Sequence, residues 1–382
     1  MTPGGIVENG ALVVRDGRIE SVGASVGAAD APTMAADEIV DARGLTVLPG
    51  FLDVHIHGGG GADTMDATPE ALRTICRTHA RHGTTGLLAT TMTQSREAIT
   101  AALTNARAAW EAGAEFCPDG ALVLGIHLEG PYISPKRAGA QPKAFIRPFD
   151  AGEFAGWLDA SGGAMKLLTC APEEPGADEL ITTARARGII VSLGHTDANT
   201  AQMRAALDRG ASHATHLFNQ MRPLHHREPG PIGVSLADGR VRAEVIADGQ
   251  HLAPEIVRMI VRAKGSEAVV LITDAMAGAG VGEGAYDLGG LAVTVMEGRA
   301  TLADGTLAGS VLTMGRAAAN VRQWLGLGWS EIARLTSTNV ADEMGWTTKG
   351  RLSPGTDADF VLVDEDLNVH ATFVAGRCVF QQ

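Results

Sequence analysis

The sequence predicts an α/β protein, a (β/α)8 barrel of the TIM type with a small β-sandwich domain built from both ends of the chain. Three observations lead to this fold. Short apolar runs alternate with alanine-rich segments of helical spacing through the middle of the chain; eight such runs occur; and both ends show short strands separated by turns instead. In a barrel of this kind the active site lies at the C-terminal ends of the strands.

The barrel strands are expected at the eight apolar runs, and helices at the amphipathic stretches between them. The runs are 51–56, 86–91, 123–128, 166–171, 189–193, 214–218, 243–247 and 269–273. Helical spacing of apolar residues occurs, among other places, at 69–79, 96–110, 177–187, 200–208 and 254–263. Residues 49–349 are therefore expected to form the barrel.

The two ends of the chain share a different texture. Ala11–Val14 and Ile19–Val22 flank a turn, and Ala358–Val363 and Ala371–Val374 are separated by turn-like residues. We expect residues 1–48 and 350–382 to form one discontinuous β domain.

Composition excludes several classes of protein. A net charge of −13 argues against a nucleic-acid binder, because no basic stripe is present to neutralise phosphates. No apolar run approaches the roughly 18 residues of a membrane helix. The four cysteines form no C-x-x-C motif, so neither a disulfide framework nor a cysteine zinc site is expected, and a reducing, cytoplasmic location fits.

Imidazoles and carboxylates gather where the predicted strands end. The six segments concerned are His55-x-His57, His127-Leu-Glu129, Gly194-His195, Thr215-His216, Asp248-Gly-Gln-His251 and Thr273-Asp274. Two-residue spacing on a strand places both rings of the first pair on one face. The four glycines after His57 allow a sharp turn beside those rings.

These residue types suit a divalent metal centre of a hydrolase. Glu129, His195 and His216 offer three nitrogen and oxygen ligands and leave a position open. His55 and His57 offer ligands for a second ion, with Glu129 bridging the two. A bound divalent ion lowers the pKa of water and polarises a carbonyl, and Asp274 fits as the general base that carries the proton to a leaving amine.

The ordered set of motifs resembles the N-acetylglucosamine-6-phosphate deacetylase family of the amidohydrolase superfamily, over nearly the whole chain. The motifs are His55-x-His57, His127-Leu-Glu-Gly-Pro131, Gly194-His-Thr196, Thr215-His-Leu-Phe-Asn219, Arg227-Glu-Pro-Gly230, Asp248-Gly-x-His251, Thr273-Asp274 and Leu307-Ala-Gly-Ser310. The resemblance implies a hydrolase that removes the N-acetyl group from an amino-sugar 6-phosphate. It implies one or two divalent ions, with zinc in first place and iron or manganese as alternatives.

The resemblance also assigns roles by position. The metal ligands would be Glu129, His195 and His216, with His55 and His57 for a second ion that some relatives lack, and Asp274 would be catalytic. The substrate would contact residues at three places, namely Ala140 and Gln141, then Asn219, Gln220, Arg227 and His251, and finally Leu307, Ala308 and Gly309. In this family the arginine enters the site of the neighbouring subunit, so a homodimer is implied.

Two features depart from the family. Many members carry a histidine twelve residues after the ligand glutamate, where this chain has Ala140-Gln141. Glutamine can donate a hydrogen bond but cannot carry a proton, so a slower reaction or a different acyl group or sugar is expected. By comparison with the family, we also expect the short N-terminal segment to lack the first strand of the β domain.

Three alternatives remain. The substrate could be a related sugar such as N-acetylgalactosamine 6-phosphate. A cyclic-amide hydrolase normally has a carboxylated lysine at the end of strand four, but Lys166 opens that run and Ala171-Pro-Glu-Glu174 follows it. A non-catalytic barrel would have lost ligands or Asp274.

Four further polar residues receive structural interpretations. His79 is expected on the surface, and His213 and Asp53 in structural roles. Asp197 is expected to orient His195 or to cap the following helix.

Overall fold

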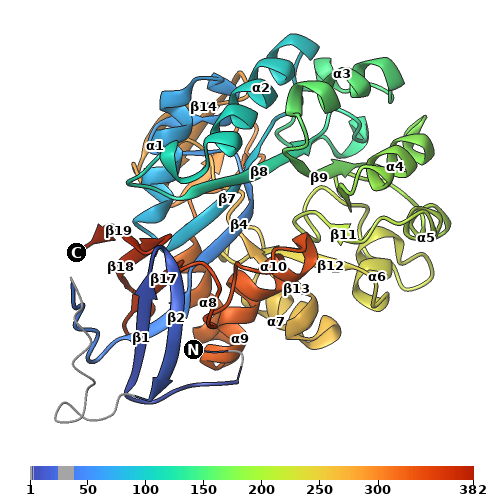
Figure 1. Cartoon of the computed structure of the whole chain (residues 1–382). Coiled ribbons are helices and arrows are strands. Elements are labelled where there is room, and N and C mark those ends of the chain that lie inside the picture. The colour runs from blue at the N-terminus through green and yellow to red at the C-terminus, as the bar shows by residue number, and fades with distance from the viewer. Residues whose placement is uncertain (1, 3, 25–37) are drawn as a thin grey trace.

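The computed structural model describes residues 2, 4–24 and 38–382, and its centre is a parallel eight-stranded sheet. The strands follow one another in chain order around the sheet (Figure 1). They are β4 Phe51–Ile56, β7 Thr84–Thr90, β8 Leu122–Glu129, β9 Met165–Cys170, β10 Ile190–Leu193, β11 His213–Ala214, β12 Arg242–Ile246 and β13 Val269–Ile272. The backbone N–H of Asp274 donates to the His55 carbonyl at 2.9 Å, which links the last strand to the first. The predicted barrel fold is confirmed.

One predicted strand is much shorter than expected. Of the run 214–218 only Ala214 lies in a strand, the two-residue β11, and the chain leaves the sheet at Thr215. His216 and Phe218 have positive φ values of 30° and 81°, which no strand accommodates. The apolar residues of this run pack in a turn that carries His216, the proposed metal ligand. The run therefore did not indicate a strand.

The helices surround the sheet, and the five predicted ones are present within three residues at each end. The helices are α1 Pro69–Ala80, α2 Arg96–Ala112, α3 Ala151–Ser161, α4 Ala177–Ala186, α5 Thr200–Asp208, α6 Gly230–Ala237, α7 Pro254–Lys264, α8 Met314–Leu325, α9 Trp329–Ala333 and α10 Asn339–Met344. A π-helical turn, Arg334–Thr338, joins α9 to α10, and five 3-10 turns lie elsewhere in the described chain. No helix among the described residues is long and apolar enough to cross a bilayer.

Helix α1 shows how the sequence sets one of these elements. The Thr68 side chain caps its first turn by accepting from Ala71 N at 3.2 Å, and Pro69 occupies the first helical position. Leu72, Ile75 and His79 lie on the buried face. The surface position expected for His79 is therefore wrong: the ring is fully buried, and its Nε2 lies 3.0 Å from the Gly58 carbonyl.

The two ends of the chain meet beside the barrel (Figure 1). Strand β3 Thr46–Pro49 pairs with β17 Phe360–Val363, and β18 Val369–Val374 and β19 Arg377–Gln381 complete an antiparallel sheet. The hairpin of β1 Gly10–Arg15 and β2 Arg18–Ala24 lies against it, with Ile19 N donating to Thr356 O at 2.9 Å. The division into two domains stays a prediction, with this pairing in its favour.

Two small antiparallel sheets inside the barrel segment were not anticipated. Strands β14 Gly284–Leu288, β15 Leu291–Met296 and β16 Arg299–Thr301 form an antiparallel sheet that packs through Leu288 and Val293 on Met92 and Met276. Strands β5 Gly58–Gly59 and β6 Ala62–Asp63 turn through the four glycines. Gly60 has φ +67°, and a Cβ on it would lie 2.3 Å from Thr78 Oγ1, so glycine is required there.

Candidate metal centre

The carboxylate of Glu129, at the end of β8, lies between four histidine rings. Its Oε1 is 3.2 Å from His195 Nε2, 3.3 Å from His55 Nε2 and 3.4 Å from His216 Nε2. Its Oε2 is 3.3 Å from His57 Nε2. All five side chains are buried. The sequence thus predicted a set that the structure brings together from the ends of β4, β8, β10 and β11.

Hydrogen bonds fix which nitrogen of two rings carries the proton. His195 Nδ1 donates to the Arg137 carbonyl at 2.8 Å, and His55 Nδ1 donates to Glu244 Oε2 at 3.0 Å. In the neutral tautomer each Nε2 therefore presents a lone pair toward Glu129. His195 Nε2 and His216 Nε2 lie 3.1 Å apart, so two nitrogens face one point.

These donors fit divalent cations. His55 Nε2 and Glu129 Oε1 are buried without a hydrogen-bond partner in the described part of the chain, and such groups normally have one. Two groups of ligand atoms each lie within 4.8 Å of one another, namely Glu129, His195 and His216, and His55, His57 and Asp274. Imidazole and carboxylate ligands suit zinc and other first-row metals.

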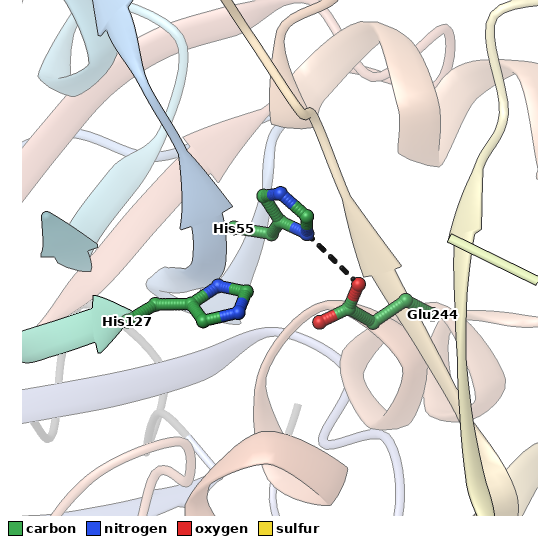
Figure 2. Close-up of side chains that lie close together, drawn as sticks. All are labelled: His55, His127 and Glu244. Carbon is green, nitrogen blue, oxygen red and sulfur yellow. Dashed lines mark hydrogen bonds and ion pairs between the residues drawn. The ribbon is translucent and has the colours of Figure 1, made fainter. Parts of the chain in front are cut away.

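A third group of polar side chains, His55, His127 and Glu244, also meets this distance limit (Figure 2). His127 does not have a nitrogen free for an ion, because its Nδ1 is 3.2 Å from Val54 O and its Nε2 is 2.8 Å from Thr169 Oγ1. Burial lowers the pKa of His127 to about 3, which keeps the ring neutral. His127 therefore packs beside His55 and offers no ligand atom.

Left-handed backbone places three of the polar side chains. His195, His216 and Asp274 have φ values of 46°, 30° and 49°. Such a conformation costs about 1–3 kcal/mol per non-glycine residue and persists where the surroundings fix it. Here Ser134 N donates to His195 O at 2.9 Å, and Ser310 N donates to Asp274 O at 2.7 Å. The strained turns aim the side chains inward from successive strand ends.

Asp274 lies beside the second pair of histidines. Its Oδ1 is 3.3 Å from His57 Nε2 and 3.6 Å from His55 Nε2. Burial by itself would raise the pKa of Asp274, but the positive charge of His55 and the hydrogen bond and charge of His57 outweigh burial and lower it. An ionised carboxylate next to the ligand atoms is able to accept a proton.

A cavity of about 280 Å³ opens in front of this cluster. All but three of the residues singled out from the sequence line it, together with Met92, Leu288 and Thr306, which were missed. The lining residues from the sequence set are His57, Glu129, Ala140, Gln141, His195, His216, Asn219, Gln220, His251, Asp274, Leu307 and Gly309.

Three of the expected site residues lie elsewhere. His55 is buried behind the cavity, and Ala308 is buried in the apolar cluster under the β14–β16 sheet. Arg227 is exposed, and its Nη1 lies 2.7 Å from His226 Nε2. Within this single chain Arg227 does not line the cavity.

Gln141 and His251 both line the cavity and are each held by hydrogen bonds. Gln141 Nε2 donates to Glu129 Oε2 at 2.6 Å, and its Oε1 accepts from Thr93 N at 2.7 Å. His251 Nδ1 lies 2.7 Å from Asp248 Oδ2. Burial disfavours the charged His251 ring, but Asp248 raises its pKa above the ordinary value on balance.

The structure assigns Asp197 a different place from the expected one. It pairs with Arg137 at 2.7 Å and with Arg222 at 3.3 Å, and Asn199 caps α5. His195 is oriented by the Arg137 carbonyl instead. Asp53 accepts from Thr273 Oγ1 at 2.5 Å in a structural role, as expected.

Comparison with known proteins agrees with this geometry. The amidohydrolase family model matches residues 46–379. The chain is 44% identical to the N-acetylglucosamine-6-phosphate deacetylase of Bacillus subtilis, over 100% of this chain and 95% of that protein. It is 36% identical to an N-acetylgalactosamine-6-phosphate deacetylase of Escherichia coli O157:H7, over 86% of each chain.

Solved structures give the same result. The chain superposes with a TM-score of 0.89 and 38% identity on a mutant N-acetyl-D-glucosamine-6-phosphate deacetylase of Mycobacterium smegmatis in complex with N-acetyl-D-glucosamine-6-phosphate, covering 97% of this chain and 95% of that one. The chain therefore belongs to the N-acetylglucosamine-6-phosphate deacetylase family of the amidohydrolases.

Proposed function

We propose that the protein hydrolyses the acetamide of an N-acetylated hexosamine 6-phosphate and releases acetate and the free amine. The observation that carries the proposal is the Glu129 carboxylate between four buried imidazoles, with ionised Asp274 at the edge of the cavity. The related deacetylases supply the substrate class. A non-catalytic barrel is disfavoured because the ligand set and Asp274 are both present.

The chemistry follows from the placement of these side chains. Glu129, His195 and His216 would hold one divalent ion and His55 with His57 a second, and such ions lower the pKa of water and polarise an amide carbonyl. Zinc is our first choice from the ligand types. The water oxygen bonds to the amide carbon as Asp274 takes a proton from the water. Asp274 then delivers that proton to the amide nitrogen, and the C–N bond breaks to release acetate and the free amine.

At its phosphate end the substrate would lie against Asn219, Gln220 and His251, which line the cavity. We propose that Arg227 completes this end in a neighbouring copy of the chain, as a homodimer. In support, Arg227 is exposed and forms no ion pair with a carboxylate of residues 2, 4–24 or 38–382. The remaining contacts with the acetyl end would come from Ala140, Leu307 and Gly309.

A cyclic-amide hydrolase is disfavoured by the position of Lys166. Its Nζ donates to Gly163 O at 2.8 Å and lies 4.8 Å from the centroid of the Trp110 ring, at the opposite end of β9 from the ligands. It is unable to bridge two ions as a carboxylated lysine. The four free cysteines suit the cytoplasmic location that we propose.

Acetate release from four sugars tests the proposal: the N-acetyl derivatives of glucosamine and galactosamine, each with and without a 6-phosphate. Two or more charge-assisted hydrogen bonds to phosphate, at about 1.5–3 kcal/mol each, predict a preference of at least about 100-fold for phosphorylated sugars. Asp274→Asn should lower the rate by about 10²–10⁴. Equal rates with and without phosphate would refute the phosphate site, and full activity of Asp274→Asn would refute the base.

A further inference from the structure

A buried carboxylate outside the cavity contacts both halves of the metal centre. Glu244 lies in the middle of β12 and is fully buried. Its Oε2 accepts from His55 Nδ1 at 3.0 Å and from the backbone N–H of His216 at 2.9 Å. Figure 2 shows the first of these bonds crossing from β12 to the His55 ring. One oxygen atom thus holds a residue from each proposed ion site.

The other oxygen of Glu244 leads away from the metal centre. Its Oε1 is 3.2 Å from His213 Nε2, and His213 Nδ1 is 2.9 and 3.0 Å from the two oxygens of Glu343. Because a carboxylate only accepts, a ring placed between two carboxylates donates from both nitrogens and is positively charged. Burial lowers the pKa of His213, but Glu343 and Glu244 outweigh burial and raise it to about 10. Arg242, 3.8 Å from Glu343, continues the alternation of charge.

This arrangement explains how a charged group is tolerated inside the barrel. An isolated carboxylate is strongly disfavoured in an apolar interior, whereas a carboxylate with three donors and a cationic neighbour is not. The hydrogen bond from His55 Nδ1 to Glu244 orients the ring so that its Nε2 faces Glu129. Glu244 does not line the cavity, so any effect on the reaction passes through His55 and His216.

We propose that Glu244 is a positioning residue of the metal centre. Its carboxylate fixes the His55 ring for one ion and the left-handed His216 backbone for the other, and His213 with Glu343 holds that carboxylate in place. The inference rests on the proposed function only in that it requires divalent ions at these ligands. Partners that orient metal ligands typically change metal affinity 10–100-fold when they are substituted.

The test compares zinc affinity in three variants by competition with a chelator, together with the visible spectrum of the cobalt-substituted protein. Glu244→Gln should weaken the ion held by Glu129, His195 and His216 by about 10–100-fold and alter the cobalt bands. His55→Ala should weaken only an ion at the His55–His57 pair. Glu153→Gln is the control, because Glu153 is another buried carboxylate, paired with Tyr132 and Arg147 away from the site.

The proposal is overturned if Glu244→Gln binds zinc with the wild-type affinity, or if it matches His55→Ala in losing one ion alone. If Glu244→Gln fails to fold, Glu343→Gln serves instead, since it removes only the negative charge on the outer side of His213. It should weaken zinc binding severalfold, and an unchanged affinity would overturn the proposal equally. No substrate enters these measurements, so they separate the role of Glu244 from an error in the assigned deacetylation.

Discussion

Replacing Gln141 by alanine should destabilise the metal-free protein more than the same replacement of any other glutamine that lines the cavity. Gln141 is 4% exposed and is fixed at both ends of its amide. Its Nε2 donates to the Glu129 carboxylate at 2.6 Å, and its Oε1 accepts from Thr93 N at 2.7 Å. Alanine removes a hydrogen bond to a charged group and leaves the Thr93 N–H buried without this acceptor.

The magnitude follows from those two contacts. A hydrogen bond to a charged group contributes about 1.5–3 kcal/mol, and a buried donor without a partner costs about 1–3 kcal/mol. Gln141→Ala should therefore lower the free energy of unfolding by about 2.5–6 kcal/mol. Gln94 is a matched control: it bonds through both ends of its amide to Gly289 O and Ser95 N, but these partners are neutral and the side chain is half-buried. Gln94→Ala should lower it by no more than about 1–2 kcal/mol.

Urea unfolding monitored by tryptophan fluorescence, in the presence of a chelator, measures the free energy of unfolding of both variants without a contribution from bound ions. If Gln141→Ala lowers the free energy of unfolding by no more than Gln94→Ala does, the Glu129 contact does not carry the energy assigned to it. Gln141→His tests the departure from the family separately. A large gain in deacetylation rate would show that the family's usual substrate is not the native one.

Three other predictions concern the ions, the phosphate and the second subunit. Removal of divalent ions should abolish acetate release. It should also lower the free energy of unfolding by about 2.7 kcal/mol, relative to protein in a free metal concentration of 100 times the dissociation constant. An apoprotein of unchanged stability and activity would contradict the metal centre. Since Asp248 raises the pKa of His251, KM for a phosphorylated sugar should stay low through pH 6.5 and rise only above that raised pKa, where the ring loses its charge. In Asp248→Asn the rise should begin at lower pH, and an unshifted profile would exclude His251 as the phosphate's cation. Mixed refolding of equal amounts of Arg227→Ala and Asp274→Asn should restore about one quarter of the wild-type activity, because half of the dimers then contain one complete site; no recovery would place Arg227 outside the partner's site.

The sequence was sufficient for the barrel and for most of the cavity because both depend on local signals. Histidines and carboxylates directly after apolar runs marked the ends of strands, and parallel strands bring those ends together. The prediction of a strand at 214–218 was wrong because the conformation there is not indicated by a local signal. The apolar residues of this run are buried in a turn, and a left-handed residue such as His216 has no signature in hydrophobic periodicity.

Other features depended on partners that are distant in the sequence. Glu244 interrupts an apolar run, which marks a charge inside the barrel, but the three groups that donate hydrogen bonds to its carboxylate lie on β4, β11 and the turn after β11. His79 falls four residues after Ile75 and seven after Leu72, so helical spacing already placed it on the buried face. Residues Leu291–Met296 alternate between buried and exposed, as a strand does. They follow the last predicted barrel strand, however, and nothing in the barrel pattern gave a reason to expect a separate sheet there.

The antiparallel pairing of β3 with β17 has a consequence for how the protein is made. Pro49 pairs with Phe360, and only Gly50 separates β3 from β4, the strand that carries His55 and ends directly before His57. During synthesis the first histidine strand leaves the ribosome long before the segment that anchors its base. An unfinished chain keeps the edge of β3 unpaired, and an unpaired edge invites aggregation or proteolysis. Completion of the polypeptide is thereby coupled to the anchoring of the strand that begins the metal centre.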